Sequence, residues 1–286
     1  MKKLLLIFVI AVIALTSCEK VIDIDLNLAD PALVIEGKIL KDSLAQVLIQ
    51  KTTSYFTPDT QQCVCDAVVI IQEDDSRPDT LEYLGDGLYK STSMRGKSDA
   101  NYHLTIIDDS QTYTASSYLP AEPHIYQLTS ISMLAFGGFG DSLMTPPGGG
   151  MGNSDSIPWL IFTDLYDDPL DENYYLFKYF LNGEDVTTAY RTSDDEGAEN
   201  DTLNYMGGFS RFYLGDTVTV KAYAVDRDVY IYFETLNDVF SSNPIMSSTP
   251  YNPHSNISNG ALGVFSAMSS DSKTTIIMPE LPAFPK

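Results

Sequence analysis

The three histidines of the chain are too far apart in sequence to indicate a catalytic or metal centre. His103, His124 and His254 have no histidine partner at helical spacing, which a zinc protease motif requires. The sequence also lacks the Gly-x-Ser-x-Gly turn of serine hydrolases and a phosphate-binding loop. Carboxylates are so frequent that no single pair indicates glycoside hydrolysis, which needs two carboxyl groups roughly 5 to 10 Å apart across a cleft. We therefore predict that the protein is not an enzyme and has no catalytic residue.

One acidic segment contains oxygen ligands of the kind that calcium prefers. Asp164, Asp167, Asp168, Asp171 and Glu172 lie close together in the sequence and supply hard oxygen atoms. Their spacing is not that of an EF-hand loop, so a solvated acidic loop is the favoured interpretation and a Ca²⁺ site is the alternative. We predict no metal ligand and no other cofactor.

Two cysteines in the first half of the chain could form a disulfide. If Cys63-Val64-Cys65 lies in a strand, both thiols point to one face of the sheet. In an oxidising compartment they could then form a tight, strained bridge. A redox or metal role would need partner residues that the sequence does not show, so we expect a structural pair.

The amino terminus has the segment order of a secretory signal peptide. Lys2 and Lys3 precede an apolar run from Leu4 to Ala14, and small residues follow it. The run is shorter than the roughly 20 residues that span a bilayer, and no later segment approaches that length. We therefore expect that residues 1–17 are cleaved and that the chain is exported.

The end of this signal peptide, Leu15-Thr16-Ser17-Cys18, resembles a bacterial lipobox. The resemblance implies that Cys18 is diacylated on its thiol, that cleavage precedes it, and that the new amine is acylated. Buried acyl chains contribute roughly 0.8 kcal/mol per CH₂, so two or three chains hold a protein durably on a leaflet. An ordinary secreted protein with a chance cysteine is the alternative. Glu19, Asp23 and Asp25 resemble the surface-export signals of Bacteroidetes lipoproteins, which implies display on the cell exterior.

Acidic residues strongly outnumber basic ones. The chain has 39 Asp and Glu against 17 Lys and Arg, a formal net charge of −22. Loss of Lys2 and Lys3 with the signal peptide makes the net charge about −24. This charge argues against nucleic acid as a partner, because phosphates need Lys and Arg, and against peripheral binding to anionic lipid. It is typical of a soluble surface protein.

The mature sequence predicts a mostly β protein with two β-sandwich-like domains and one helix. We expect residues 18–30 to form a tether, 31–124 an Ig-like N-terminal sandwich, and 125–286 a second β domain. Alternating apolar residues and turn signals predict the strands. They cover residues 33–39, 45–52, 67–71, 80–84, 88–90, 102–107, 112–115, 125–133, 158–164, 173–180, 186–190, 217–224, 262–268 and 274–278.

Two segments of the second domain differ from this pattern. Apolar residues from Val229 to Phe240 recur at helical spacing, and Asp226 and Asp228 suit the positive end of a helix dipole. We predict a helix over residues 226–241 that covers the second sheet. Residues 136–153 are rich in Gly and Met and cannot build a core, which predicts a long loop. That loop could carry binding or have no role.

Several stretches occur in order along the chain from Cys18 to near residue 278. They are residues 18–26 and 33–37, residues 87–89 and 102–106, residues 171–177, and residues 243–244 and 256–265, the last set being the most specific. Together they resemble domain-of-unknown-function family 4249, a family of Bacteroidetes outer-membrane lipoproteins. The resemblance implies an accessory lipoprotein, commonly encoded beside a TonB-dependent transporter, and it supplies no catalytic residues. The loop at residues 137–152 has no counterpart in it.

The sequence also predicts a turn near the C-terminus and two alternative functions. Within the most specific stretch, we expect Asn256, Asn259 and Gly260 to shape a turn. The favoured function is a non-catalytic binding accessory of a TonB-dependent nutrient import complex, held at the outer membrane by acylated Cys18 and facing outward. Its expected partners are the lipid bilayer, a TonB-dependent outer-membrane barrel and an unknown ligand. The alternative is a structural or adhesive cell-surface lipoprotein with no transport role.

Overall fold

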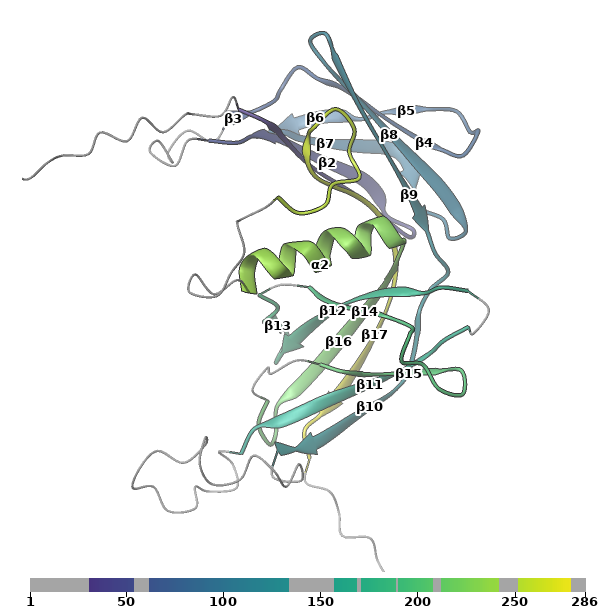
Figure 1. Ribbon diagram of the computed structural model, residues 1–286, viewed down its shortest axis with the longest axis vertical. Coiled ribbons are helices and arrows are strands. Elements are labelled where there is room, and N and C mark those ends of the chain that lie inside the picture. Colours follow the sequence, from purple (N-terminus) through teal and green to yellow (C-terminus); the bar gives the residue numbers. More distant parts are fainter. Residues whose placement is uncertain are drawn as a thin grey trace, which may run out of the picture. The chain divides into compact units, whose positions relative to one another are not determined.

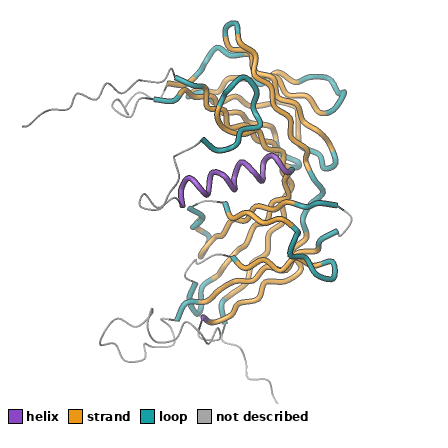
Figure 2. Tube along the Cα trace, in the orientation of Figure 1, coloured by secondary structure: helices purple, strands orange, loops and turns teal. Residues whose placement is uncertain are grey.

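The computed structural model describes residues 31–53, 62–133, 157–168, 171–188, 190–207, 212–241 and 252–278 (Figure 1). Residues 1–30, with the predicted signal peptide, Cys18 and the tether, lie outside the described residues. The predicted Gly- and Met-rich loop at 136–153 also lies outside them. The described part is dominated by strands, with one helix (Figure 2). This confirms the predicted fold class.

Most predicted strands are present, with bounds that differ by a few residues. In chain order the strands are β1 (Leu33–Leu40), β2 (Leu44–Lys51), β3 (Gln62–Cys63), β4 (Val68–Glu73), β5 (Asp79–Thr80), β6 (Glu82–Gly85), β7 (Leu88–Arg95), β8 (Ala100–Asp108), β9 (Gln111–Leu119), β10 (His124–Ser132), β11 (Trp159–Tyr166), β12 (Tyr174–Leu181), β13 (Glu184–Asp185), β14 (Arg191–Asp194), β15 (Thr202–Met206), β16 (Thr217–Val225) and β17 (Leu262–Ile276). Strands β3, β13, β14 and β15 were not predicted.

The largest sheet has ten strands, and eight of them follow the order β13-β12-β16-β17-β1-β2-β7-β6. Strand β14 also pairs with β12, and β3 pairs with β2. Strand β17 joins the two parts of this sheet, because residues 262–268 pair in parallel with β1 and residues 269–276 pair antiparallel with β16. Strand β17 thus pairs with β1, which precedes residue 124 in the chain, and with β16, which follows it. The domain boundary predicted at residue 124 stays a prediction.

The closing strands predicted at 262–268 and 274–278 are present up to Ile276, but the predicted break between them was wrong. Strand β17 is continuous over fifteen residues. The polar residues between the predicted strands stay extended because they have partners outside β17. The Ser269 hydroxyl donates to the Ala121 carbonyl (2.7 Å), and the Asp271 carboxylate accepts from the Ile125 amide (2.9 Å).

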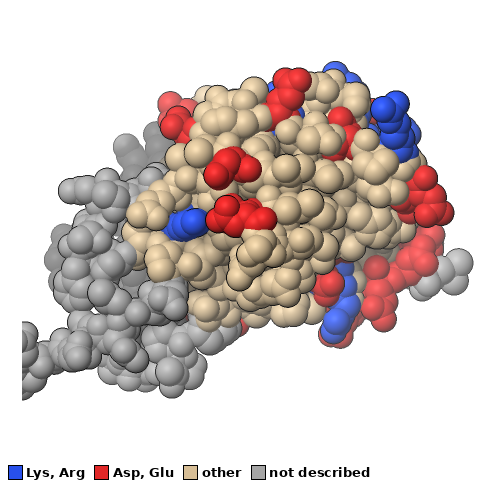
Figure 3. Space-filling model, turned by 90° about the horizontal axis from the view of Figure 1, so that it is seen from above, with Lys and Arg blue, Asp and Glu red and all other residues tan. Residues whose placement is uncertain are grey.

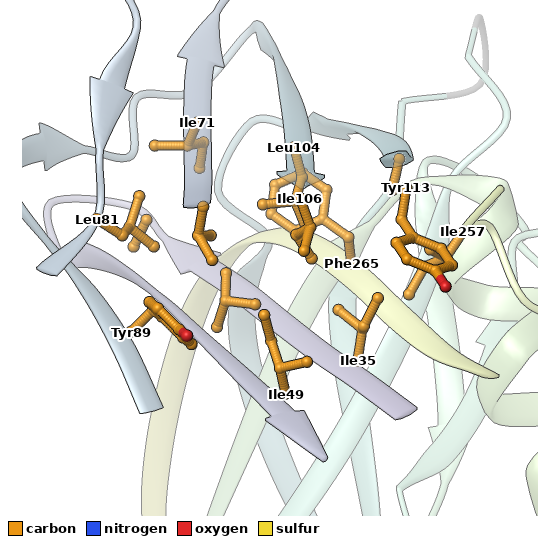
Figure 4. Packing of buried hydrophobic residues seen from close by; sticks show 14 of the residues in the cluster. Ile35, Ile49, Ile71, Leu81, Tyr89, Leu104, Ile106, Tyr113, Ile257 and Phe265 are labelled. Atoms are coloured by element: carbon orange, nitrogen blue, oxygen red, sulfur yellow. The ribbon is translucent and has the colours of Figure 1, made fainter. Parts of the chain in front are cut away.

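The first sandwich packs a four-stranded sheet, β5-β4-β8-β9, against the β1-β2-β7 part of the large sheet. Ile35 and Ile49 from the large sheet meet Leu104 and Ile106 from β8, and Phe265 of β17 completes this core (Figure 4). Alternate residues of each strand are buried, as expected for sheets with one solvated face. Full burial of such a side chain contributes about 1.5–3 kcal/mol.

The second sandwich packs the three-stranded sheet β10-β11-β15 against β12 and β16. Ile161 and Leu165 of β11 face Phe177 of β12 and Val220 of β16 in a shared core. The rings of Phe177 and Tyr205 stack with centroids 4.0 Å apart and an interplanar angle of 4°. Strand β12 is buried on both faces, because helix α2 covers the other one.

Helix α2 (Arg227–Ser241) confirms the predicted helix to within one residue. The residue before it, Asp226, caps it by accepting a hydrogen bond from the Val229 amide (2.9 Å). Its apolar side packs with Leu176 of β12, Tyr223 of β16 and Met268 of β17, so it covers the sheet as predicted. Among the described residues, no helix combines the length and apolar character needed to cross a bilayer.

The predicted return strand at residues 186–190 was wrong. A tight turn with positive φ at Asn182 (52°) and Gly183 (90°) follows β12, but β13 ends at Asp185. The Thr187 hydroxyl then accepts from the Tyr179 amide (2.8 Å) and donates to the Tyr179 carbonyl (3.1 Å). The Thr187 hydroxyl takes the place of a backbone carbonyl as the partner of the Tyr179 amide. The pairing along this edge of β12 therefore stops there and resumes only in β14.

Candidate functional site

A surface depression of about 500 Å³ lies where the start of β10 passes β17. It is lined by Glu122, Pro123, His124 and Ile125 from one segment and by Ser270, Asp271, Ser272 and Lys273 from the other. The two segments are brought together because β17 continues past its pairing with β1 and follows β16 into the second sandwich.

Two side chains of β17 hold the backbone of β10 at this depression. Asp271 Oδ2 accepts a hydrogen bond from the Ile125 amide (2.9 Å). Lys273 Nζ donates to the carbonyls of Tyr126 (2.6 Å) and Ile125 (3.4 Å). Asp271 Oδ1 also accepts from the Ser272 amide (2.7 Å). Asp271 and Lys273 are therefore fixed in place by backbone partners.

Three amphipathic side chains flank these charges. His124 lies with its Nδ1 atom 3.9 Å from Asp271 Oδ2, and its ring is largely exposed. Tyr166 lies directly opposite His124 in the β10–β11 ladder, so both side chains share one sheet face. Tyr166 is 54% exposed and Tyr126, at a bulge in β10, is 43% exposed.

This arrangement suits binding more than chemistry. Exposed tyrosines offer an apolar ring face together with a hydroxyl that can donate or accept. The Tyr126 hydroxyl lies at the limit of hydrogen-bond distance (3.5 Å) from Thr202 Oγ1. The depression can therefore contact a ligand or a polypeptide through ring faces, hydroxyl groups and the fixed carboxylate of Asp271.

A second depression, of about 430 Å³, lies where the described chain begins. It is lined by residues 31–33, Lys51, the β8–β9 turn at 108–111, Tyr113 and residues 259–261. It has one cationic side chain, Lys51, and two acidic ones, Asp108 and Asp109. No exposed aromatic side chain flanks it among these lining residues, so we regard the depression at β10 and β17 as the better candidate.

The carboxylates considered for calcium have different surroundings. Asp167 is buried, and its Oδ1 accepts from the Tyr175 hydroxyl (3.2 Å). Burial raises the pKa of Asp167, with the charge of Asp195 adding to the effect. Glu172 is exposed and accepts from the Tyr174 hydroxyl (2.9 Å). Within the described ranges, no group of three or more His, Cys, Asp or Glu side chains is placed to hold a metal ion. The predicted absence of a metal ligand stays a prediction.

The two cysteines lie at the surface as free thiols. Cys63 ends β3 and Cys65 follows the strand, while Val64 between them is buried. The two exposed thiols therefore flank the buried Val64 in the sequence. The disulfide between them stays a prediction.

The family-like stretch near the C-terminus forms the expected turn. Asn259 (φ 58°) and Gly260 (φ 73°) adopt left-handed conformations there. Asn256 Oδ1 accepts from the Phe265 amide (3.0 Å), and its Nδ2 donates to the Phe265 carbonyl (2.8 Å). The asparagine side chain thereby pairs with β17 as a strand backbone would. This confirms the structural interpretation of Asn256.

The family assignment follows from a comparison of the whole chain. A family model described as a domain of unknown function, DUF4249, matches residues 19–274. The chain belongs to this family. In this DUF4249 protein the matched region begins directly after the predicted lipidated cysteine and ends within β17. It therefore includes both sandwiches, α2 and the depression at β10 and β17.

Comparisons with characterised proteins add little to this assignment. No curated protein matches the DUF4249 chain. Among solved structures, the chicken interferon gamma receptor alpha chain, in its selenomethionine form, is 9% identical, with 69% of this chain and 90% of that chain covered. The TM-score is 0.20, too low to support an argument from shared structure.

The residues that build the candidate site were not found from sequence. The sequence singled out His124 only as an isolated histidine, and it did not single out Tyr126, Tyr166, Asp271 or Lys273. Asp271 contacts Ile125 across 146 residues of chain. No local spacing could have indicated this contact.

Proposed function

We propose that the protein is a non-catalytic binding accessory of a TonB-dependent nutrient import complex at the outer membrane, anchored through acylated Cys18. The observation that carries the proposal is the open depression between β10 and β17. Two exposed tyrosines neighbour its lining residues: Tyr126 follows Ile125 in β10, and Tyr166 pairs with His124. The signal peptide and the lipobox-like end of it support the location. The implied association with TonB-dependent transporters supports the choice of partner.

The geometry of the depression favours binding over catalysis. Of its two carboxylates, Asp271 already accepts hydrogen bonds from the amides of Ile125 and Ser272, and Glu122 pairs with Lys41 (2.9 Å). Its lysine, Lys273, donates to two backbone carbonyls. Side chains that are hydrogen-bonded to the backbone in this way stabilise the shape of the surface. They are poorly placed to move a proton to and from a substrate, because a general base must reach the proton that it abstracts.

The first experiment is affinity capture of the tagged full-length protein from gently solubilised outer membranes, followed by mass spectrometry. We expect a TonB-dependent barrel in stoichiometric amount. Recovery of the lipoprotein alone, from membranes in which the barrel is demonstrably present, would contradict the proposal and favour the structural or adhesive alternative.

Variants of the two tyrosines test whether the depression is the contact. Y126A and Y166A should each reduce barrel recovery several-fold, because exposed tyrosines often dominate binding energy at interfaces. The matched control is Y83A on β6, which removes a tyrosine of similar exposure (41%) from the first sandwich. Equal recovery by all three variants, with a barrel still captured, would place the contact elsewhere on the protein.

A further inference from the structure

Strand β17 has an open edge in its second half. Along residues 262–268 one edge of β17 pairs with β1, which ends at Leu40, and the Lys41 amide donates to the Met268 carbonyl (2.9 Å). Along residues 269–276 the other edge pairs with β16, as β17 runs on into the second sandwich (Figure 1). Within the described ranges, no strand pairs with the edge that β1 leaves at Met268. We call this edge, along residues 270–276, the open edge.

The backbone groups at the open edge belong to the even-numbered residues. Neighbouring residues of a strand direct their N–H and C=O groups to opposite edges. Met268 faces β1, whereas the Ile277 amide donates to the carbonyl of Asp216, which precedes β16 (2.9 Å). The Ser272 amide is engaged, because it donates to Asp271 Oδ1 (2.7 Å). The edge therefore offers the amides of Thr274 and Ile276 and the carbonyls of Ser270, Ser272, Thr274 and Ile276.

The depression of the candidate site lies at the start of this open edge. Its lining includes Ser270 and Ser272, which belong to the edge. It also includes Glu122, whose carboxylate pairs with Lys41 Nζ (2.9 Å) directly after the end of β1. The depression of about 500 Å³ is therefore open where the row of β1 would continue alongside β17.

We infer that an extended segment of another polypeptide adds to the open edge as a strand, in line with β1. Exposed strand edges commonly bind peptides in this way, because main-chain hydrogen bonds hold the segment and alternate side chains give specificity. The inference rests on the proposed function for the location of the binding site, and it adds the kind of partner and the way in which it is held.

The side chains beside the open edge define the chemistry of the segment. An added strand would place alternate side chains beside Asp271 on one face of the sheet and beside Ile276 on the other. The Asp271 carboxylate and the formal net charge of −22 favour basic side chains on the first face. Ile276 is 47% exposed and Met278 is 60% exposed, so apolar side chains fit the second face. The segment thus has basic and apolar residues in alternation.

Two other occupants fit the open edge less well. The C-terminal residues of the chain include Pro279, Pro282 and Pro285, which lack the amide hydrogen that a paired strand donates. A second copy of the chain would bring a further net charge of −22 to the edge. The partner is therefore a different polypeptide with a basic segment.

The first test measures binding of a capped peptide of alternating valine and lysine to the full-length protein in detergent. The peptide should bind, with its lysines beside Asp271 and its valines beside Ile276. The control peptide has the same side chains and charge but N-methylated amides, which cannot donate hydrogen bonds. This control is needed because Asp and Glu side chains are spread over other surfaces too, including the end that bears the first sandwich (Figure 3). Equal binding of the two peptides, or binding of neither, would overturn the inference.

A matched pair of variants tests the backbone of the edge. T274P removes the amide that faces the open edge, and it leaves intact the pairing with β16, in which that amide takes no part. Binding of the alternating peptide should weaken about tenfold or more. T274V should bind as the unmodified protein does, because it keeps the amide and, like T274P, loses the hydroxyl that contacts Thr219 (2.7 Å). Unchanged binding by T274P, with the circular dichroism spectrum of the unmodified protein, would overturn strand addition.

Hydrogen exchange gives a readout that needs no variant. In the free protein the amides of Thr274 and Ile276 should exchange quickly, whereas those of Lys273 and Thr275, which face β16, should exchange slowly. The alternating peptide should protect Thr274 and Ile276, and failure to protect them would overturn the inference. A dimer of the peptide-free protein in which these two amides are protected would also overturn it, because a second copy would then occupy the edge.

The peptide tests are independent of the barrel. Peptide binding at the open edge without recovery of a barrel would contradict the proposed complex and leave strand addition standing. Recovery of a barrel by the unmodified protein, together with failure of the peptide tests, would leave the proposed complex standing and overturn strand addition.

Discussion

The half-buried carboxylate of Asp226 accepts a hydrogen bond from the Ser117 hydroxyl, which ties the start of α2 to β9 across 109 residues of chain. The same carboxylate accepts from the amides of Tyr118 (2.9 Å) and Val229 (2.9 Å). The Ser117 oxygen in turn accepts from the Ala267 amide of β17 (2.9 Å). One side chain therefore connects the first sandwich, the helix and the strand that joins the two parts of the large sheet. Burial raises the pKa of Asp226 despite these donors.

Replacement of Asp226 should destabilise the fold well beyond the loss of a helix cap. D226A leaves the Ser117 hydroxyl and two backbone amides without this acceptor, and each unsatisfied buried group costs about 1–3 kcal/mol. We expect a fall of at least about 2 kcal/mol in the free energy of unfolding, measured by chemical denaturation with circular dichroism. The matched control is D228A, an exposed aspartate in the same helical turn. It should cost about 0.3–1 kcal/mol through the helix dipole alone. Equal losses in both variants would contradict the bridging role of Asp226.

Gly263 is required where β17 passes β1. Its φ is +103°, and a Cβ atom there would lie 2.1 Å from the Ile35 carbonyl oxygen. G263A should therefore lower the free energy of unfolding by about 3 kcal/mol or more, since it adds a clash to backbone strain. Gly183 provides the control, because its φ is +90° but a Cβ atom there would have no neighbouring atom within 4 Å. G183A should cost about 1–2 kcal/mol from strain alone. Similar losses for the two variants would show that β17 moves aside to accept the methyl group.

Asp79 should make part of the stability depend on pH in the acid range. Burial alone would raise the pKa of Asp79, but hydrogen bonds from the Ser91 hydroxyl and the Met94 amide (3.0 Å) together lower it. A carboxyl whose folded pKa is lowered stabilises the fold above its unfolded pKa of about 3.9 and loses that contribution as pH falls through the folded pKa. The difference in unfolding free energy between the unmodified protein and D79N should thus be constant near neutrality and shrink below about pH 4.

The control for this pH dependence is D75N, at an exposed aspartate beyond the end of β4. Denaturation curves collected from pH 7 to pH 3 for the three proteins provide the measurement. A D79N difference that stays unchanged down to pH 3 would rule out the hydrogen-bonded carboxylate as its source.

Cys18 should control membrane attachment without affecting the fold. C18S removes the thiol that is predicted to receive the lipid, so the protein should move from the membrane fraction to the soluble fraction, because burial of acyl chains would be lost. Intact-mass measurement should show acyl chains on the unmodified protein and none on C18S. Thermal unfolding of the two should coincide if the described fold is independent of the anchor. Membrane attachment that survives in C18S would contradict the lipoprotein interpretation.

Consecutive residues were enough to identify most strands and α2. The alternation in β1, β8 and β9 and the helical spacing from Val229 to Phe240 follow from local geometry, since side chains repeat every two residues in a strand and about every 3.6 in a helix. The Asn182-Gly183 turn also has a local cause, because both residues tolerate positive φ. Local patterns failed where side chains replaced the backbone as partners, as Thr187 does for Tyr179.

The contacts that make the candidate site were beyond the reach of such patterns. Asp271 and Lys273 are two polar residues in a polar run, and they acquire a role only because β17 brings them to the start of β10. The outer face of the sheet β5-β4-β8-β9 likewise results from pairing three strands in one register, which places Ile70, Thr105 and Thr114 side by side. Spacing along the chain therefore decides which segments are strands or helices, and it predicts an export signal at the amino terminus. Long-range pairing decides which side chains meet, because it joins residues that are more than a hundred positions apart.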